Sequence, residues 1–419
     1  MSNSLAIKIP PGAATKRQPQ SGCDPGGQPG RMVVEKAPAE AGQAALRLII
    51  AGGGTGGHLF PGIAIAEEAM ARNEGCRVLF IGTGRPFESK ILAAKGFCQE
   101  KINVLGIKGM GVLKQAGAVL RLPAAIQRSI AILHKFRPNL VLGLGGYSSG
   151  PVVIAAWLLR IPRVLHEQNL LPGITNRLLS AFANRIYVSF DNTRFPRFRQ
   201  KLRITGNPVR REFLEGLAAT ESPDETNCSN RRFTVMVVGG SQGAHSLNMA
   251  VIEAVSHLSN THRYQFIHQT GEADEAQVRQ AYRHHGISAD VGPFFNDMAG
   301  RYQRADLVIC RAGATTIAEL TIMGKGVIFI PFPYAADDHQ ALNAAGLVSE
   351  NAAEMIREKD LSGKLLAHKI ENFAAVPEKL AAMARRAKQL GRPQAAEQIV
   401  DDMARLIGLK DSRGRVKDV

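Results

Sequence analysis

The sequence lacks the features that mark several common classes of protein. Its five cysteines are scattered without a C-x-x-C pair, which argues against a zinc ribbon or a disulfide framework and suggests a reducing cytoplasm. No apolar run approaches the roughly 20 residues of a membrane-spanning helix. The longest runs, 152–159 and 326–333, have the length of buried strands or short core helices. With one tryptophan, six tyrosines and no recognisable nucleic-acid-binding module, the chain also offers little to a nucleic acid.

Acidic residues are scarce in one half of the chain. Residues 1–210 carry 28 Lys and Arg against 10 Asp and Glu, a net charge of +18. Residues 211–419 carry 24 against 26, a net charge of −2. A basic half beside a nearly neutral half suggests that one half meets a polyanion, such as a membrane surface, phosphates or a nucleic acid. A solvated basic surface without a specific partner is the alternative.

The sequence does contain a recurring unit of apolar strand, glycine-rich turn and helix. The unit occurs four times, at 46–70, 139–159, 233–255 and 305–324. Its strands are continuous runs of Val, Ile and Leu, which are typical of parallel strands covered on both faces. The first and third units look alike. We therefore predict an α/β protein with two Rossmann-like, doubly wound parallel-sheet domains that face a cleft.

Composition also predicts the domain boundaries in this chain of 419 residues, which is long enough for two ordinary domains. Residues 1–45 are rich in Pro, Gly and Gln, and we expect them to form a disordered extension. The N-terminal domain is expected over 46–208 and the C-terminal domain over 209–395. The remaining stretch, 396–419, is expected to hold a helix that can return to the N-terminal domain, followed by a tail.

The first glycine-rich turn, GGGTGGH at 52–58, satisfies G-x-G-x-x-G between a strand and a helix. Glycines let the backbone approach a ligand closely, and a helix N-terminus presents free N–H groups to an anion. The second strand ends in Gly82–Gly84 without the acidic residue that an NAD site needs, and His58 and Leu59 stand where a P-loop has Lys and Ser or Thr. A pyrophosphate-binding turn of another kind remains, with close strand–helix packing as the alternative.

His58 stands at the expected start of the helix. The partial positive charge there lowers the pKa of an imidazole and favours its neutral form, which can accept a proton. A packed or capping histidine is the alternative interpretation.

Seven motifs, in order, resemble those of the MurG family, the bacterial UDP-N-acetylglucosamine transferases of peptidoglycan synthesis. The resemblance covers about residues 46 to 409 and implies the GT-B fold of two Rossmann-like domains. It also implies an inverting transfer of N-acetylglucosamine from UDP to the C4 hydroxyl of the muramoyl sugar of lipid I, giving lipid II, with no cofactor and no obligatory metal. No D-x-D motif occurs in the sequence. The motifs are GGGTGGHLFPGIAIA, GGYSSGPVVIAA, HEQNLLPGITNR, TGNPVR, GGSQGAHSLN, CRAGATTIAEL and PFPYAADDHQALNA.

The resemblance assigns roles to individual residues. His58 is the first choice for the general base, and Glu167 is the alternative unless it forms a structural pair with His166. Gly145, Gly146, Tyr147 and Ser149, in GGYSSG, could cup the diphosphate of the acceptor. The residues implied for the UDP-sugar are Thr55, Gly56, Gly57, Asn169, Arg210, Ser241, Phe295, Ala314, Thr315, Thr316, Glu319 and Gln340.

The resemblance also predicts a location, because lipid I is anchored in the membrane. We expect a peripheral protein on the cytoplasmic face of the cell membrane, held by residues 87–98 and 106–122, which mix lysines with apolar residues, and by Trp157. Ordinary amphipathic core helices are the alternative for both segments. The expected partners are UDP-N-acetylglucosamine, lipid I and an anionic membrane surface, with a cell-wall synthesis complex as a further candidate and no nucleic acid. The rival functions are a UDP-sugar 2-epimerase, a transferase with a soluble acceptor, and a basic nucleic-acid binder.

Overall fold

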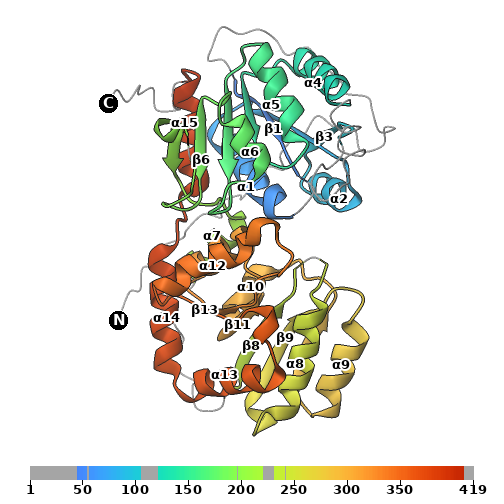
Figure 1. Ribbon diagram of the computed structural model, residues 1–419, viewed down its shortest axis with the longest axis vertical. Helices are drawn as coiled ribbons and strands as arrows, with labels where there is room; N and C mark the ends of the chain where they lie inside the picture. The colour runs from blue at the N-terminus through green and yellow to red at the C-terminus, as the bar shows by residue number, and fades with distance from the viewer. Residues whose placement is uncertain are drawn as a thin grey trace, which may run out of the picture.

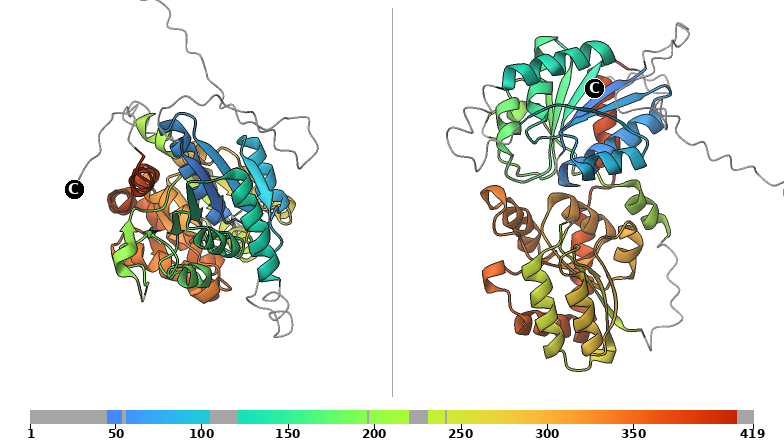
Figure 2. Two further views of the ribbon diagram at one scale, coloured as in Figure 1. Left: turned by 90° about the horizontal axis from the view of Figure 1, so that it is seen from above. Right: turned by 90° about the vertical axis from the view of Figure 1, so that its right-hand side faces the viewer.

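A computed structural model describes the chain as two lobes stacked along its long axis (Figure 1). Each lobe is built on one parallel sheet, which confirms the predicted fold class. The right-hand view in Figure 2, from the side, shows helices on both faces of each sheet. The described residues are 45–53, 56–104, 121–195, 197–219, 231–240 and 242–409.

The first lobe contains a sheet of seven parallel strands among the described residues, in the order β3-β2-β1-β4-β5-β6-β7. Continuous apolar runs form its centre: every residue of β4 is buried, and four of the five residues of β1 are buried. This burial on both faces is what the unbroken Val, Ile and Leu runs predict. The strands are β1 Arg47–Ala51, β2 Arg77–Gly82, β3 Cys98–Lys101, β4 Leu140–Gly143, β5 Arg163–Glu167, β6 Arg185–Val188 and β7 Leu202–Ile204.

Helices cover both faces of the first sheet. The longest described one, α1, follows directly on the first glycine turn and buries eight of its residues. Cys76 and Cys310 are free. The helices are α1 Gly56–Arg72, α2 Pro86–Ala94, α4 Leu122–Phe136, α5 Ser149–Leu158 and α6 Ile174–Leu179, with the 3₁₀ turn η1 Arg199–Lys201.

The second lobe repeats the arrangement with six parallel strands in the described part, in the order β10-β9-β8-β11-β12-β13. In both sheets the first strand of the lobe pairs with the second and the fourth. This is the Rossmann strand order, which places a switch point, and therefore a ligand crevice, beyond the carboxyl ends of these central strands. The strands are β8 Phe233–Val238, β9 Tyr264–Gln269, β10 Ser288–Gly292, β11 Leu307–Cys310, β12 Gly326–Phe329 and β13 Glu354–Met355.

The helices of the second lobe pack on the two faces of its sheet and enclose two apolar clusters. Residues such as Leu307 and Ile328 on one face, and Val308 and Phe329 on the other, are fully or almost fully buried. The helices are α7 Arg211–Ala219, α8 His245–His257, α9 Glu275–His284, α10 Met298–Arg304, α11 Ala314–Met323, α12 His339–Ser349, α13 Gly363–Ala375 and α14 Pro377–Leu390, with the turns η2 Thr261–Arg263, η3 Ala336–Asp338 and η4 Glu358–Asp360.

The last described helix, α15 (Ala395–Leu406), crosses back and packs against α1 of the first lobe (Figure 1). Ile399 and Met403 are buried in the same apolar cluster as β1 and α1. The buried carboxylate of Asp402 accepts a hydrogen bond from the hydroxyl of Tyr187 at 3.0 Å and pairs with Arg185. The first lobe therefore completes its core with residues from the far end of the chain.

The chain crosses between the lobes twice, after β7 and after α14. These crossings lie side by side, because a Cβ atom on Gly206 would come 2.6 Å from the Cβ of Arg392. A cavity of about 690 Å³ adjoins both crossings. Across the described residues, no helix is both long enough and apolar enough to cross a bilayer.

Candidate active site

A pocket of about 370 Å³ lies between the lobes, at the carboxyl ends of the central strands. Both lobes contribute to its wall: the start of α1 and the loop after β5 from the first, and the starts of α11 and α12 from the second. Ten of the residues predicted for the base and the UDP-sugar line it together. They are Gly56, Gly57, His58, Asn169, Arg210, Ala314, Thr315, Thr316, Glu319 and Gln340.

The glycines of the two similar turns allow loops to pack closely beneath this pocket. A Cβ atom on Gly52, whose φ is +144°, would lie 2.8 Å from the Cβ of Leu144. A Cβ atom on Gly243, whose φ is +75°, would lie 2.2 Å from the carbonyl oxygen of Thr270. Both positions therefore exclude other side chains for steric and conformational reasons. Close packing thus accounts for these two glycines, whereas Gly56, Gly57 and Gly240 line the pocket itself.

His58 lies in the first turn of α1 and faces the pocket. Burial and, to a smaller extent, charge repulsion from the nearby His339 together lower the pKa of His58 to about 4. The imidazole is therefore neutral at physiological pH and can accept a proton. Its position in the pocket and its neutral state both suit a general base.

Glu167, the alternative base, is 1% exposed at the end of β5 and does not line the pocket. Its carboxylate accepts the backbone N–H groups of Asn169 and Gly173, each at 3.0 Å, and the side-chain amide of Asn176 at 2.9 Å. Burial raises its pKa, and these hydrogen bonds oppose the rise. This geometry suits a residue that holds the loop after β5 in shape. No bond joins Glu167 to His166, whose ring nitrogens face Gly206 and Gln168.

Arg210 and Glu319 form a buried ion pair in the pocket wall, with an N–O distance of 3.0 Å. Burial alone would lower the pKa of Arg210, but the carboxylates of Glu319 and Glu212 outweigh it and raise the pKa. The guanidinium lies 4.6 Å from the ring centre of Phe60 on α1, so it contacts both lobes. The two residues predicted for a phosphate and a ribose therefore hold each other in place.

The start of α11 faces the first lobe across the pocket. Gly313 is its N-terminal cap residue, and the first-turn residues Ala314, Thr315 and Thr316 line the pocket. The hydroxyl of Thr315 donates a hydrogen bond to the carbonyl of Gly57 at 3.1 Å, which joins the two glycine-containing segments. A helix N-terminus with unpaired N–H groups is suited to bind a phosphate.

Two predicted sugar ligands are already engaged in hydrogen bonds. The side-chain oxygen of Gln340 accepts the backbone N–H groups of Phe332 at 3.0 Å and Ala312 at 3.2 Å. Any contact of Gln340 with a sugar must therefore come from its amide nitrogen. The side-chain oxygen of Asn169 accepts a hydrogen bond at 3.1 Å from Asn343 on α12, which fixes Asn169 from the opposite lobe.

The remaining predicted residues lie elsewhere. Phe295 is buried, and its N–H group donates to the side chain of Gln269 at 2.9 Å, while its neighbour Phe294 lines the pocket. Thr55 and Ser241 fall outside the described residues. The predicted acceptor loop Gly145–Ser149 does not line the pocket but contacts the turn after β1.

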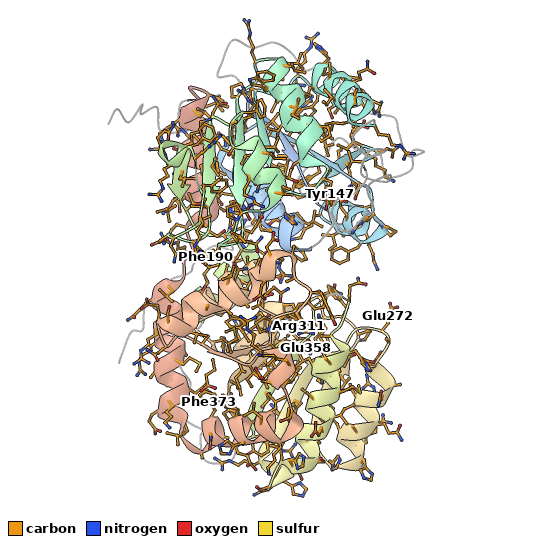
Figure 3. The ribbon with its side chains drawn as sticks, viewed as in Figure 1. Tyr147, Phe190, Glu272, Arg311, Glu358 and Phe373 are labelled. Atoms are coloured by element: carbon orange, nitrogen blue, oxygen red, sulfur yellow. The ribbon has the colours of Figure 1, made fainter. Side chains whose placement is uncertain are left out.

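Sequence reasoning missed Asn343 and Arg311, although both stand in quoted motifs. Asn343 is fully buried, and its oxygen also accepts the N–H group of Leu170 across the lobes at 2.9 Å. Arg311 pairs with Glu358 at 2.6 Å and donates to the hydroxyl of Ser246 at 3.2 Å (Figure 3). Their polarity within apolar surroundings was the available signal. Their partners are far apart in sequence, so the partners themselves were not predictable.

Among the residues that the structure describes, no three His, Cys, Asp or Glu side chains gather as metal ligands. The cations at the pocket are side chains, chiefly Arg210. Negative charge that develops in the pocket would meet this guanidinium and the amide dipoles at the start of α11.

Comparisons with known proteins fit this arrangement. Residues 48–188 match the glycosyltransferase family 28 N-terminal domain and residues 234–399 match the corresponding C-terminal domain. The crystal structure of Acinetobacter baumannii MurG superposes with a TM-score of 0.68 at 30% identity, over 85% of this chain and 98% of that one. The UDP-GlcNAc 2-epimerase of Neisseria meningitidis, at 13% identity and a TM-score of 0.61, covering 85% of this chain and 98% of that one, shares the fold alone.

Fold, pocket and matching domains define a glycosyltransferase of the GT-B class. A curated relative from Anaeromyxobacter sp. (strain Fw109-5), a UDP-N-acetylglucosamine–N-acetylmuramyl-(pentapeptide) pyrophosphoryl-undecaprenol N-acetylglucosamine transferase, is 48% identical over 363 residues, which are 86% of this chain and 94% of the relative. The chain belongs to this family of N-acetylglucosamine transferases, the MurG family.

Proposed function

We propose that this protein transfers N-acetylglucosamine from UDP-N-acetylglucosamine to the C4 hydroxyl of the muramoyl sugar of lipid I, forming lipid II for peptidoglycan. The observation that carries the proposal is the single pocket in which His58 of one lobe meets Arg210, Glu319 and the start of α11 of the other. In this proposal residues 46–208 provide the acceptor and membrane side, residues 209–395 bind the donor, and α15 joins the two.

On the donor side, the diphosphate lies at the start of α11, where the N–H groups of Ala314, Thr315 and Thr316 face it. Arg210 turns part of its guanidinium from Glu319 to a phosphate, and Glu319 accepts the ribose hydroxyls. The hydrogen bond from the Phe295 N–H group to Gln269 leaves the Phe295 carbonyl as the backbone group that can meet the uracil. Ser241 remains a proposed phosphate contact.

On the acceptor side, His58 removes the proton of the C4 hydroxyl while its oxygen attacks the anomeric carbon. The bond from that carbon to the β-phosphate oxygen breaks on the opposite face, so the configuration inverts and UDP leaves as an anion. Arg210 and the amide groups of α11 stabilise this charge as it develops. Gln340, Asn169, Thr55, Gly56 and Gly57 hold the transferred sugar.

The turn Gly145–Ser149 is proposed to receive the diphosphate of lipid I. Gly145 and Gly146 have φ values of +89° and +75°, and Tyr147 is 37% exposed at the edge of the first lobe (Figure 3). The buried hydroxyl of Ser149 donates to the carbonyl of Gly146 at 2.9 Å, so Ser149 shapes the turn from within.

The reaction is tested by incubating the protein with radiolabelled UDP-N-acetylglucosamine and a lipid I analogue. We expect labelled disaccharide lipid, and we expect the rate to persist with excess chelator, because a cationic side chain and amide dipoles take the place of a metal. Free UDP with no labelled lipid would contradict the acceptor, and formation of UDP-N-acetylmannosamine would favour the epimerase. Loss of turnover in chelator, restored by Mg²⁺ or Mn²⁺, would contradict the account of the leaving group.

We propose that the first lobe binds the cytoplasmic face of an anionic membrane. At the end of α5, Trp157 is 45% exposed and Leu158 is 52% exposed, and Arg160 follows them. Exposed apolar residues beside a cation suit the interface of an anionic bilayer. Of the segments predicted to dock, 87–98 forms α2 and the start of β3, whereas most of 106–122 lies outside the described residues.

Replacing both Trp157 and Leu158 by Glu should release the protein from phosphatidylglycerol vesicles. Each new carboxylate is repelled by the lipid, and the apolar contact is lost, so we expect at least about a tenfold weaker partition coefficient in a sedimentation assay. Val376→Glu on the second lobe, where the side chain is 36% exposed, is the matched control and should not change sedimentation. Equal sedimentation of the double variant and the parent protein would show that the end of α5 does not contact the membrane.

A further inference from the structure

The second lobe holds a cavity of about 540 Å³ that the proposed reaction does not use. It lies at the starts of β8, β11 and β12, so it is at the opposite edge of the sheet from the active site. Helix α14 closes one side of it. Its lining combines arginine and lysine side chains with an apolar wall that includes Phe233 and Leu380.

The lining is strongly cationic. Among the described residues, it includes four basic side chains, Arg231, Arg232, Arg263 and Lys325, and a single carboxylate, Asp306. This excess does not follow from the overall charge, since residues 211–419 have a net charge of −2. The cavity therefore concentrates positive charge within a nearly neutral half of the chain.

The one carboxylate is already in use. Asp306 pairs with Arg231 through one oxygen and accepts the backbone N–H group of Thr234 through the other at 2.8 Å. Within the described ranges, no carboxylate lies within 4.0 Å of the charged groups of Arg232, Arg263 or Lys325. Three positive charges at this cavity thus form no ion pair with a described carboxylate.

Two of these cations are held in place by backbone carbonyl groups. The ammonium of Lys325 donates to Ala305 at 2.9 Å and to Gln303 at 3.0 Å, and the guanidinium of Arg263 donates to Ala374 at 2.6 Å. Such contacts order the side chains without neutralising them. Arg232 is exposed at the mouth, so it can move to meet an incoming anion.

We propose that this cavity is a second binding site, for a soluble phosphate-bearing molecule no larger than a nucleotide. Arginine and lysine side chains are suited to phosphate oxygens, and the volume lies in the range of small-molecule sites. The phosphate would lie among Arg232, Arg263 and Lys325. The rest of the molecule would pack on the apolar wall of Phe233, Leu380 and the neighbouring alanines of α14.

The protonation of Lys325 gives the site a second measurable property. Burial lowers the pKa of Lys325 to about 8, Asp306 opposes this effect and Arg231 adds to it. Near pH 8 about half of these side chains are neutral, and a bound phosphate favours the charged form. Binding at this pH should therefore take up protons from the buffer.

The test is isothermal titration calorimetry of the full chain with adenosine monophosphate, in the presence of saturating UDP to occupy the active site. We expect one bound molecule per chain, and proton uptake at pH 8 when two buffers of different ionisation enthalpy are compared. Arg232→Glu should weaken binding at least about tenfold, because it replaces an attractive charge by a repulsive one. Arg283→Glu, which changes an exposed arginine on α9 away from the cavity, should bind as the parent protein does.

Three results would overturn the proposal. One is the absence of binding by adenosine monophosphate and by inorganic phosphate up to about 10 mM. Another is equal weakening by the two arginine variants, which would indicate general charge attraction. The third is Arg232-dependent binding to phosphatidylglycerol vesicles without binding of either soluble probe, which would assign the site to a lipid headgroup. Because Arg232 is exposed, its variant should unfold at the same temperature as the parent protein.

Discussion

His58→Ala is expected to lower kcat by about 10²- to 10⁴-fold, the usual contribution of a positioned general base. Without the imidazole, no group at the start of α1 takes the proton of the attacking hydroxyl. The dissociation constant of UDP-N-acetylglucosamine should change by less than about threefold, because the phosphate and ribose contacts are proposed to come from the second lobe. Single-turnover transfer to a lipid I analogue and calorimetric titration with the donor measure the two effects.

The pH profile gives an independent check on His58. Its neutral form is the base, so kcat/KM should be insensitive to this group above its pKa of about 4 and should fall tenfold per pH unit below it. The control variant is Glu167→Gln, which removes the charge but keeps one side-chain oxygen, so it can still accept the N–H group of either Asn169 or Gly173. It should retain kcat within about tenfold. If Glu167→Gln folded normally but were inactive, and His58→Ala were active, then Glu167 and not His58 would be the general base.

Arg210→Ala is expected to damage both stability and catalysis. It leaves Glu319 buried without its partner, which should lower the free energy of unfolding by about 3–5 kcal/mol. It also removes the cation proposed to stabilise the departing UDP, so kcat/KM should fall by about 10²- to 10³-fold. Urea unfolding and steady-state kinetics on the same preparation measure the two losses.

A double variant separates these losses. Arg210→Met with Glu319→Gln removes both charges, so most of the stability should return while transfer stays slow. Arg211→Ala is the matched control, because the next arginine is exposed and pairs with Glu215 on the surface. Its unfolding free energy should change by less than about 1 kcal/mol. Recovery of transfer in the double variant would exclude Arg210 from leaving-group stabilisation.

The architecture was predictable because each strand of this fold is a local feature. The runs 48–51 and 235–238, directly before Gly52 and Gly239, are apolar throughout, and a strand buried on both faces requires this composition. The strand orders and the contact of α15 with α1 were harder, since they depend on partners far apart in sequence. Asp402 and Tyr187, for example, are separated by 215 positions, and nothing near either residue identifies the other.

The sequence predicted which residues lie in the candidate site, but it did not predict how these residues are hydrogen-bonded. Motif resemblance named His58, Arg210 and Glu319 as site residues, and all three line one pocket. His58 and Glu319 follow the central strands β1 and β11, whereas Arg210 follows the edge strand β7. The resemblance did not reveal that Arg210 and Glu319 pair with each other. Nor did it reveal that the oxygens of Glu167 are occupied by N–H groups, since hydrogen bonding depends on loop conformations that spacing does not specify.

The doubled connection between the lobes has a consequence for how substrates enter. Two chain segments that touch at Gly206 and Arg392 fasten the lobes along one margin, so the lobes can swing apart about that margin but cannot rotate freely against each other. The mouth of the active site must then widen on the far side of α11. In the proposed reaction, the lipid-linked acceptor would approach from that side.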